Sequence, residues 1–175
     1  TLTTAHPPLL ILLLHYWGVL GRSEFWLRFP SIITGMCFCW VIYRWLKIVA
    51  SDRAAMFGLS LLLFSPALVY LSAEVRQYGL LLLFSSLSLY FLESGLQLNS
   101  SARIACSSLF LVVALSSHYS ALLVALALGA YTLARFTTLK LSLGTLAIWV
   151  AGQLVAIAFV SLLYFTHIAK LRARG

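Results

Sequence analysis

The fold is decided by residues 56–92, which read MFGLSLLLFSPALVYL (56–71), SAEVRQYG (72–79) and LLLLFSSLSLYFL (80–92). Two apolar runs, which we interpret as membrane helices, enclose a polar segment with Glu74 and Arg76. Glu74 is one of only four acidic residues in the chain. A charge near the centre of a bilayer costs roughly 2.5–3.5 kcal/mol, so such residues pair with each other or line a polar cavity. The stretch alone leaves both interpretations open.

The composition of the whole chain indicates a membrane protein. The 175 residues are 62% hydrophobic and 9% charged, whereas a soluble domain carries about 25% charged residues. The net charge of +8 is spread along the chain in ones and twos, which is typical of membrane-protein loops and excludes a nucleic-acid-binding patch. The three cysteines lie inside apolar runs without a redox or zinc spacing. We therefore expect an all-α, polytopic transmembrane helix bundle with one domain over residues 1–175.

The apolar runs predict one interfacial juxtamembrane helix followed by six spans. His6-Pro7-Pro8 opens a helix over residues 7–20, because proline is tolerated in the first turn. This helix would extend ~20 Å, too short for a hydrocarbon core of ~30 Å, so we expect it to lie in the membrane interface. The spans are expected at about residues 24–49, 54–71, 76–92, 104–117, 119–134 and 143–166.

Three details of this topology depend on local sequence. Pro66 predicts a kink within the span 54–71. Residues 93–103, ESGLQLNSSAR, are interpreted as a polar loop. Residues 104–134 leave two alternatives, one helix that would extend ~45 Å or two short spans that meet at the corner SSHYS, and we favour the two spans.

Basic residues orient the predicted spans. Arg44, Lys47 and Arg53 lie at the end of the span 24–49 and just after it, and Arg135 and Lys140 follow the span 119–134. By the positive-inside rule these ends are cytoplasmic. The basic tail at 170–174 then lies outside, against the rule. This orientation collects four polar segments on the outer face. They are His6-Pro7-Pro8, Arg22–Arg28, Glu74–Tyr78 and His118-Tyr119.

An outer cavity with these side chains would bind an anionic lipid headgroup. An arginine can hold two phosphate oxygens at once, a carboxylate can hold a hydroxyl, a divalent cation or the arginine, and a histidine can donate to a phosphate or bind a metal. Taken singly, each residue is explained as well by a loop, core or interfacial position. The candidates are His6, Glu74, Arg76, Tyr78, His118 and Tyr119.

Three segments resemble motifs of the dolichyl-phosphate-mannose–protein mannosyltransferase-like family of polytopic, C-type glycosyltransferases. They are His6-Pro-Pro-Leu-Leu with GRSEFWLRFPSI at 21–32, SPALVYLSAEVRQY at 65–78, and Ser117-His118-Tyr119. The segments come in the order and spacing of the family and cover most of the chain. Ala73 stands where glutamine is common, and Ser117 where threonine is common. The resemblance implies sugar transfer from a polyprenyl-phosphate donor to an acceptor hydroxyl, with inversion, at the outer face of the plasma (bacterial inner) membrane.

The resemblance also implies roles for single residues. It assigns contact with the donor phosphate to His6 and Arg76, a second acidic position to Glu74, and the cavity wall to His118 and Tyr119. The family's base, an aspartate, lies upstream of the His-Pro-Pro element, so the catalytic residue stays unknown and we expect this piece of a longer protein to be inactive alone. The acceptor would be a protein, lipid or glycan, no cofactor is certain, and a divalent metal ion stays open.

Two alternatives from other classes remain. A transporter or flippase half would also contain a cavity for lipid headgroups, but many transporters are built from inverted repeats and the sequence shows none. A structural membrane subunit would need no cavity chemistry at all. An aspartate in the upstream reading frame would favour the transferase, and a second copy of the pattern downstream would favour the transporter.

Overall fold

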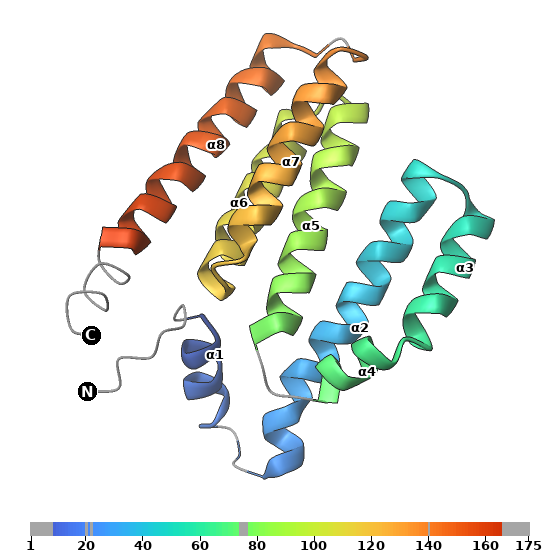
Figure 1. Ribbon diagram of the computed structural model, residues 1–175, viewed down its shortest axis with the longest axis vertical. Coiled ribbons are helices and arrows are strands. Elements are labelled where there is room, and N and C mark those ends of the chain that lie inside the picture. Colours follow the sequence, from blue (N-terminus) through green and yellow to red (C-terminus); the bar gives the residue numbers. More distant parts are fainter. Residues whose placement is uncertain (1–8, 20, 22, 74–76, 140, 166–175) are drawn as a thin grey trace.

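The chain forms a helical bundle (Figure 1). The computed structural model describes residues 9–19, 21, 23–73, 77–139 and 141–165. Within these residues there are eight helices and no strand, which confirms the predicted all-α bundle. The helices are α1 (Leu9–Trp17), α2 (Glu24–Val49), α3 (Asp52–Leu63), α4 (Pro66–Ala73), α5 (Gln77–Gln97), α6 (Ser101–Ser117), α7 (Ala121–Phe136) and α8 (Leu143–Leu163).

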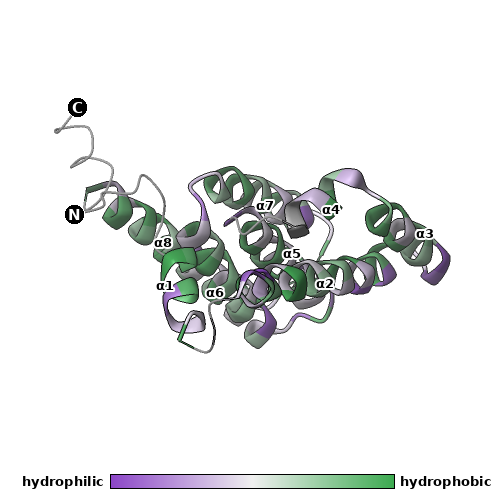
Figure 2. Ribbon diagram, turned by 90° about the horizontal axis from the view of Figure 1, so that it is seen from below, coloured by the Kyte–Doolittle hydropathy of each residue, from purple (hydrophilic) through white to green (hydrophobic). Residues whose placement is uncertain are grey.

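Three of the described helices are long and apolar enough to cross a bilayer, namely α2 with 26 residues and α5 and α8 with 21 each. α6 and α7 are shorter apolar helices of 17 and 16 residues. Large apolar side chains such as Phe25, Leu123 and Leu154 are exposed, and hydrophobic residues make up most of the helical ribbon in Figure 2. Such a surface suits contact with lipid, and the chain is an integral membrane protein.

The helix connections gather at two ends of the bundle (Figure 1). The lower end in that view holds α1, the end of α4, the start of α5 and the turn between α6 and α7. The upper end holds the connections α2–α3, α5–α6 and α7–α8. The sequence analysis assigned these two sets to opposite faces of the membrane, and which end lies outside stays a prediction.

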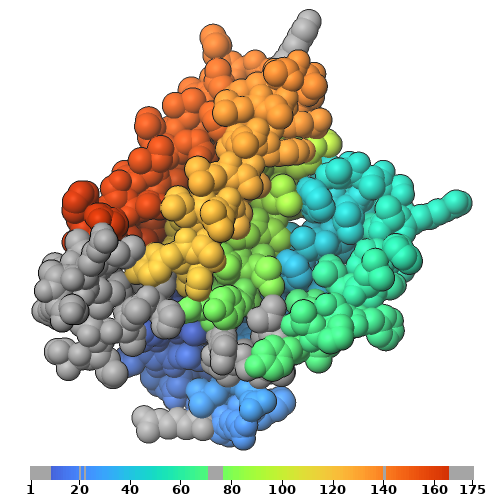
Figure 3. Space-filling view, viewed as in Figure 1, coloured from blue at the N-terminus to red at the C-terminus, as the bar shows by residue number. Residues whose placement is uncertain are grey.

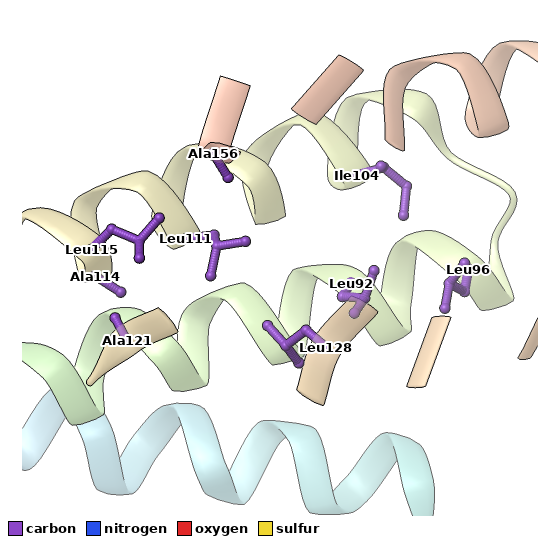
Figure 4. Packing of buried hydrophobic residues seen from close by; sticks show 9 residues of the cluster. All are labelled: Leu92, Leu96, Ile104, Leu111, Ala114, Leu115, Ala121, Leu128 and Ala156. Carbon is purple, nitrogen blue, oxygen red and sulfur yellow. The ribbon is translucent and has the colours of Figure 1, made fainter. Parts of the chain in front are cut away.

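α5 and α6 form the centre of the bundle. α2 packs against α5, α8 packs against α6, and α7 contacts both central helices. Side chains from four helices, α5 to α8, form one buried hydrophobic cluster (Figure 4). Its members are Leu92, Leu96, Ile104, Leu111, Ala114, Leu115, Ala121, Leu128 and Ala156.

Small residues bring the central helices close together, as is common in membranes, where lipid is as apolar as the side chains and packing drives association. Ser88 of α5 and Ser107 of α6 each donate a hydrogen bond to the carbonyl oxygen of the other, at 2.9 and 2.8 Å. A Cβ added at Gly152 of α8 would overlap the side chain of Ser108 on α6. Both contacts depend on the absence of a larger side chain.

A hydrogen bond joins the end of α1 to a carbonyl of α2 that an internal proline leaves without its helical donor. Pro30 has no N–H, so the carbonyl of Trp26, four residues earlier, loses its usual helical donor. The indole Nε1 of Trp17 at the end of α1 donates to that carbonyl oxygen at 2.8 Å. The rings of Trp17 and Trp26 also stack, with centroids 5.1 Å apart. The interfacial position expected for residues 7–20 stays a prediction, and residues 7, 8 and 20 lie outside the described part.

The expected span over residues 54–71, with its kink at Pro66, consists of two helices, and whether they cross the membrane stays a prediction. α3 ends at Leu63 and α4 begins at Pro66. Pro66 cannot donate to the carbonyl of Leu62, which accepts instead from the N–H of Ser65 at 3.1 Å. The sequence predicted a kink, but the chain leaves the helix and starts a new one with proline in the first position, where its missing N–H has no cost.

The polar loop expected over residues 93–103 is wrong at its start, because α5 continues beyond the expected span 76–92 to Gln97. Glu93, which the sequence analysis placed in a polar loop, therefore lies in a helix and is only 1% exposed. Its partners, described below, explain why the helix can continue through a charged residue. Residues 104–134 belong to two helices that are separated by His118–Ser120.

Candidate functional site

The structure describes three of the six candidate residues. Tyr78 lies in the first turn of α5, and His118 and Tyr119 lie in the turn between α6 and α7. The three candidates outside the described residues are His6, Glu74 and Arg76. Residues 74–76 join Ala73, the last residue of α4, to Gln77, the first residue of α5.

Tyr78 and His118 come from two separate sequence motifs and meet in the fold. Their ring centroids are 5.2 Å apart, and the ring planes are inclined by 39°. Tyr78 is 38% exposed, so its ring also borders the surface. Figure 3 shows the start of α5 and the α6–α7 turn at the same end of the molecule. The contact therefore joins the α6–α7 turn to Tyr78, which lies two residues after Arg76 in the sequence.

The ring of His118 is held by Ser120. The backbone N–H of Ser120 donates to Nδ1 of His118 at 3.0 Å, and Oγ of Ser120 lies 2.7 Å from the same nitrogen. A ring nitrogen that accepts a hydrogen bond carries no hydrogen itself, so the neutral imidazole carries its hydrogen on Nε2. The extended backbone of His118, with φ −158° and ψ 140°, ends α6 and begins the turn.

Three residues next to His118 in the sequence, Ser116, Ser117 and Tyr119, carry further hydroxyl groups. Burial raises the pKa of the Tyr119 phenol above its ordinary value, so the hydroxyl keeps its proton at neutral pH and can donate a hydrogen bond. Ser116 and Ser117 donate instead to the carbonyl oxygen of Val113, at 2.7 and 2.9 Å. These two serines stabilise the last turn of α6, and Tyr119 is the hydroxyl that we assign to the candidate site.

The basic segment 22–28 contributes less to the site than the sequence suggested. Nη2 of Arg28 lies 2.6 Å from Oε1 of Glu24, one helical turn earlier, and the two side chains are 49% and 80% exposed. An exposed pair with this spacing stabilises a helix by only about 0.3–0.5 kcal/mol. Arg28 is therefore a surface residue paired within α2, and Arg22 lies outside the described residues.

The sequence analysis missed a buried ionic cluster at the upper end of the bundle. Oε1 of Glu93 accepts hydrogen bonds from Nε2 of Gln97 at 2.7 Å and from Nη2 of Arg135 at 2.9 Å. The hydroxyl of Tyr131 donates to Oε2. The side chain of Glu93 is 2% exposed and that of Arg135 is 30% exposed. A carboxylate is buried this deeply only when it is paired and hydrogen-bonded, and three donors meet that condition here.

The spacing of these residues is the signal that could have revealed the cluster. Glu93 and Gln97 are four residues apart, as are Tyr131 and Arg135, and residues at this spacing share a helix face. The cluster lies fifteen residues beyond Tyr78 on α5, which is roughly 22 Å at 1.5 Å per residue. Both oxygens of Glu93 are engaged, so the cluster joins α5 to α7 and is separate from the candidate site.

Among the described residues, no group of three or more His, Cys, Asp or Glu side chains is arranged to hold a metal ion. The three cysteines, Cys37, Cys39 and Cys106, are free. The divalent ion that the sequence left open would involve Glu74 or a histidine of the cavity. Glu74 and His6 lie outside the described part, and the ion stays an open possibility.

Comparison with known proteins identifies one family. A family model described as dolichyl-phosphate-mannose-protein mannosyltransferase matches residues 5–165. No curated protein and no solved structure matches the chain. The matched range includes all six candidate residues and every described helix.

Proposed function

Because the chain belongs to the dolichyl-phosphate-mannose-protein mannosyltransferase family of membrane glycosyltransferases, we propose that it takes part in moving a sugar from a polyprenyl-phosphate donor to an acceptor hydroxyl. The observation that carries this proposal is the ring contact between Tyr78 and His118. It joins two of the three family-like motifs at the end of the bundle where α5 begins. Family membership favours this function over a transporter or flippase half.

In the proposed reaction the acceptor hydroxyl attacks the anomeric carbon of the donor sugar. The bond between that carbon and the phosphate oxygen breaks, and its electron pair leaves with the lipid phosphate. Attack from the opposite face inverts the anomeric configuration. The hydroxyl proton passes to a general base, which must lie within hydrogen-bond reach of it. The resemblance expects an aspartate ahead of His6 in this role, and no residue of this sequence is assigned to it.

The candidate residues have distinct proposed tasks. The guanidinium of Arg76 binds two phosphate oxygens, and together with His6 it stabilises the negative charge that grows on the leaving phosphate. Glu74 orients Arg76 or holds a hydroxyl. Tyr78 and His118 form the wall beside them. Tyr119 belongs to the same wall and would supply a neutral hydroxyl donor.

The proposed reaction takes place at the outer face of the plasma (bacterial inner) membrane, on the lower end of the bundle in Figure 1. The transferred sugar is a hexose or pentose, and the acceptor is a hydroxyl of a protein, a lipid or a glycan. The apolar faces of α2, α5 and α8 keep this end of the protein at the membrane surface, where both the lipid donor and a water-borne acceptor can reach it.

The test compares two tyrosines of the same helix in the full-length protein. Tyr78→Leu removes the ring that contacts His118, and we expect a loss of transfer of about tenfold or more, which corresponds to about 1.4 kcal/mol in the barrier. Tyr90→Leu is the control, because Tyr90 lies on α5 as well and its ring contacts only its neighbour Phe91 among the aromatic pairs of the described residues. Transfer is measured with a radiolabelled polyprenyl-phosphate hexose in vesicles.

Two results would contradict the proposal. Equal transfer by the Tyr78 and Tyr90 variants would show that the contact between Tyr78 and His118 contributes to packing and not to transfer. A wild-type protein that moves the lipid across vesicles without transferring its sugar to any acceptor would support the flippase instead.

A further inference from the structure

Ser120 differs from three other N-cap serines of this protein in the partner of its hydroxyl group. Ser23, Ser51 and Ser142 stand at the N-caps of α2, α3 and α8, and each accepts a backbone N–H through its side chain. Ser120 stands at the same position before α7 and makes no such bond. Its Oγ lies instead 2.7 Å from Nδ1 of His118. The residue type suits a helix cap, but the hydroxyl is directed at the histidine.

The direction of the two hydrogen bonds follows from their donors. A hydroxyl can donate or accept, so the contact with Oγ alone would allow either form of the ring. A backbone N–H can only donate, and the N–H of Ser120 lies 3.0 Å from Nδ1 of His118. Nδ1 must therefore be the acceptor, and the hydroxyl of Ser120 donates to it as well. A hydrogen on Nδ1 would place two donors against each other, the ring N–H and the backbone N–H of Ser120, without an acceptor between them.

We propose that Ser120 is a positioning residue that fixes His118 as the Nε2–H tautomer, so that this histidine acts in sugar transfer as a hydrogen-bond donor and not as a proton acceptor. The role in transfer rests on the function proposed above, whereas the tautomer does not. A neutral ring with its hydrogen on Nε2 offers an N–H to an anionic oxygen, such as that of a lipid phosphate. It offers no lone pair there to take the proton of the acceptor hydroxyl.

The position of His118 gives this assignment its relevance to the reaction. Its ring contacts Tyr78 of α5 with a centroid distance of 5.2 Å, and Tyr78 follows Arg76 by two residues in the sequence. The bonds to Ser120 would be enough for a histidine that only stabilised the turn. The contact with Tyr78 is additional and connects His118 to α5. A donor at this place adds to the positive charge that Arg76 would direct at the same phosphate.

The first experiment reads the tautomer directly. Nitrogen NMR of the full-length protein, labelled with ¹⁵N-histidine and kept at a pH where the ring is neutral, separates a ring nitrogen that carries hydrogen from one that does not. The signals of His118 are assigned by their loss in His118→Gln. We expect hydrogen on Nε2 in the wild type. In Ser120→Ala the backbone N–H still donates to Nδ1 but the hydroxyl donor is lost, so we expect the Nδ1–H population to increase while Nε2–H stays the major form. Hydrogen on Nδ1 in the wild type would overturn the proposal, whatever the activity.

The matched control is Ser100→Ala. Ser100 also stands at an N-cap, before α6, and makes no side-chain cap bond, but it lies at the opposite end of the bundle from His118. Ser100→Ala should leave both the tautomer and the transfer rate unchanged. Ser120→Ala should lower transfer roughly 2- to 12-fold, the factor of one net hydrogen bond. Ser120→Thr, which keeps the hydroxyl, should restore both.

A pair of substitutions at His118 separates the two ring nitrogens. The side-chain amide of Gln reaches the place of Nε2 and can donate there, whereas that of Asn ends near the place of Nδ1. We expect His118→Gln to keep more transfer activity than His118→Asn, at equal amounts of folded protein. Greater activity in His118→Asn would overturn the donor role. An unchanged tautomer and rate in Ser120→Ala would overturn the role of Ser120, and absence of any transfer in the wild type would contradict the proposed function while the tautomer result stands.

Discussion

Neutralising Glu93 should loosen α7 from α5. Glu93→Gln keeps the size of the side chain but replaces two charged oxygens by one neutral acceptor, so that the three donors compete for it. Arg135 loses its ion-pair partner, although its Nε is already buried without a hydrogen-bond partner among the described residues. The free energy of unfolding should therefore fall.

The structure sets the size of this effect. Removing one partner of a fully buried ion pair costs about 3–5 kcal/mol, because the other charge is left unpaired. Arg135 is 30% exposed, so water compensates in part, and we expect about 2–3 kcal/mol for Glu93→Gln, below the fully buried case. Glu24→Gln is the control, because it breaks the exposed pair with Arg28 and should cost no more than about 0.5 kcal/mol.

The assay is reversible unfolding of the detergent-solubilised full-length protein by SDS, followed by tryptophan fluorescence. Trp149 of α8 contacts Phe136 of α7, with ring centroids 5.1 Å apart, and so reports on the helix that the cluster holds. The double variant Glu93→Gln/Arg135→Gln should recover at least about 1 kcal/mol relative to the sum of the single variants, because it leaves no unpaired charge. Strict additivity, or a Glu93→Gln variant as stable as Glu24→Gln, would refute the reasoning.

Three further predictions concern the site, the orientation and α1. Arg76→Lys in the full-length protein should weaken binding of a polyprenyl-phosphate sugar by about 1.5–3 kcal/mol, because lysine keeps the charge and loses the planar fork; unchanged affinity would leave Arg76 only as the partner of Glu74. In a cysteine-free background, a cysteine that replaces Glu74 should react with an impermeant thiol reagent in intact cells and one that replaces Asn99 should not; the opposite labelling would invert the orientation. Trp17→Phe should lower stability by about 0.5–1.5 kcal/mol in the SDS titration, because the carbonyl of Trp26 loses its donor, and a variant as stable as the wild type would show that this bond contributes nothing.

The fold class could be predicted because it depends on the lengths of apolar runs, which are local. The end of α5 could not be predicted in the same way. Glu93 is helical and buried because Tyr131 and Arg135, 38 and 42 residues later, supply hydrogen bonds to it. A window of sequence around Glu93 contains only one of its three donors, Gln97, and reads as a polar loop. At Pro66 the local sequence did locate an irregularity in the helix, but it did not distinguish a kink from the end of one helix and the start of another.

The candidate site was predictable to the extent that motifs mark it. The motifs included Tyr78 and His118 among six candidates, and the fold brings these two rings into contact. The motifs did not indicate Ser120, because a serine before a helix is ordinarily a cap. Only the position of its hydroxyl relative to Nδ1 of His118 reveals a different partner. The motifs thus named both residues among six candidates, but the contact between them and the hydrogen on one ring nitrogen required side-chain geometry.

The two polar ends of α5 should therefore respond differently to substitution. At the upper end, the Glu93 carboxylate has both oxygens engaged by side chains of α5 and α7, so it contributes to packing and has no oxygen left for a substrate. At the lower end, Tyr78 is 38% exposed and contacts a histidine in a turn. Because roughly 22 Å of rigid helix separates them, Glu93→Gln should lower stability while the folded protein keeps its KM for the lipid donor. Tyr78→Leu should lower transfer and leave the SDS midpoint unchanged. Parallel losses of stability and transfer in both variants would show that the two ends are coupled through α5.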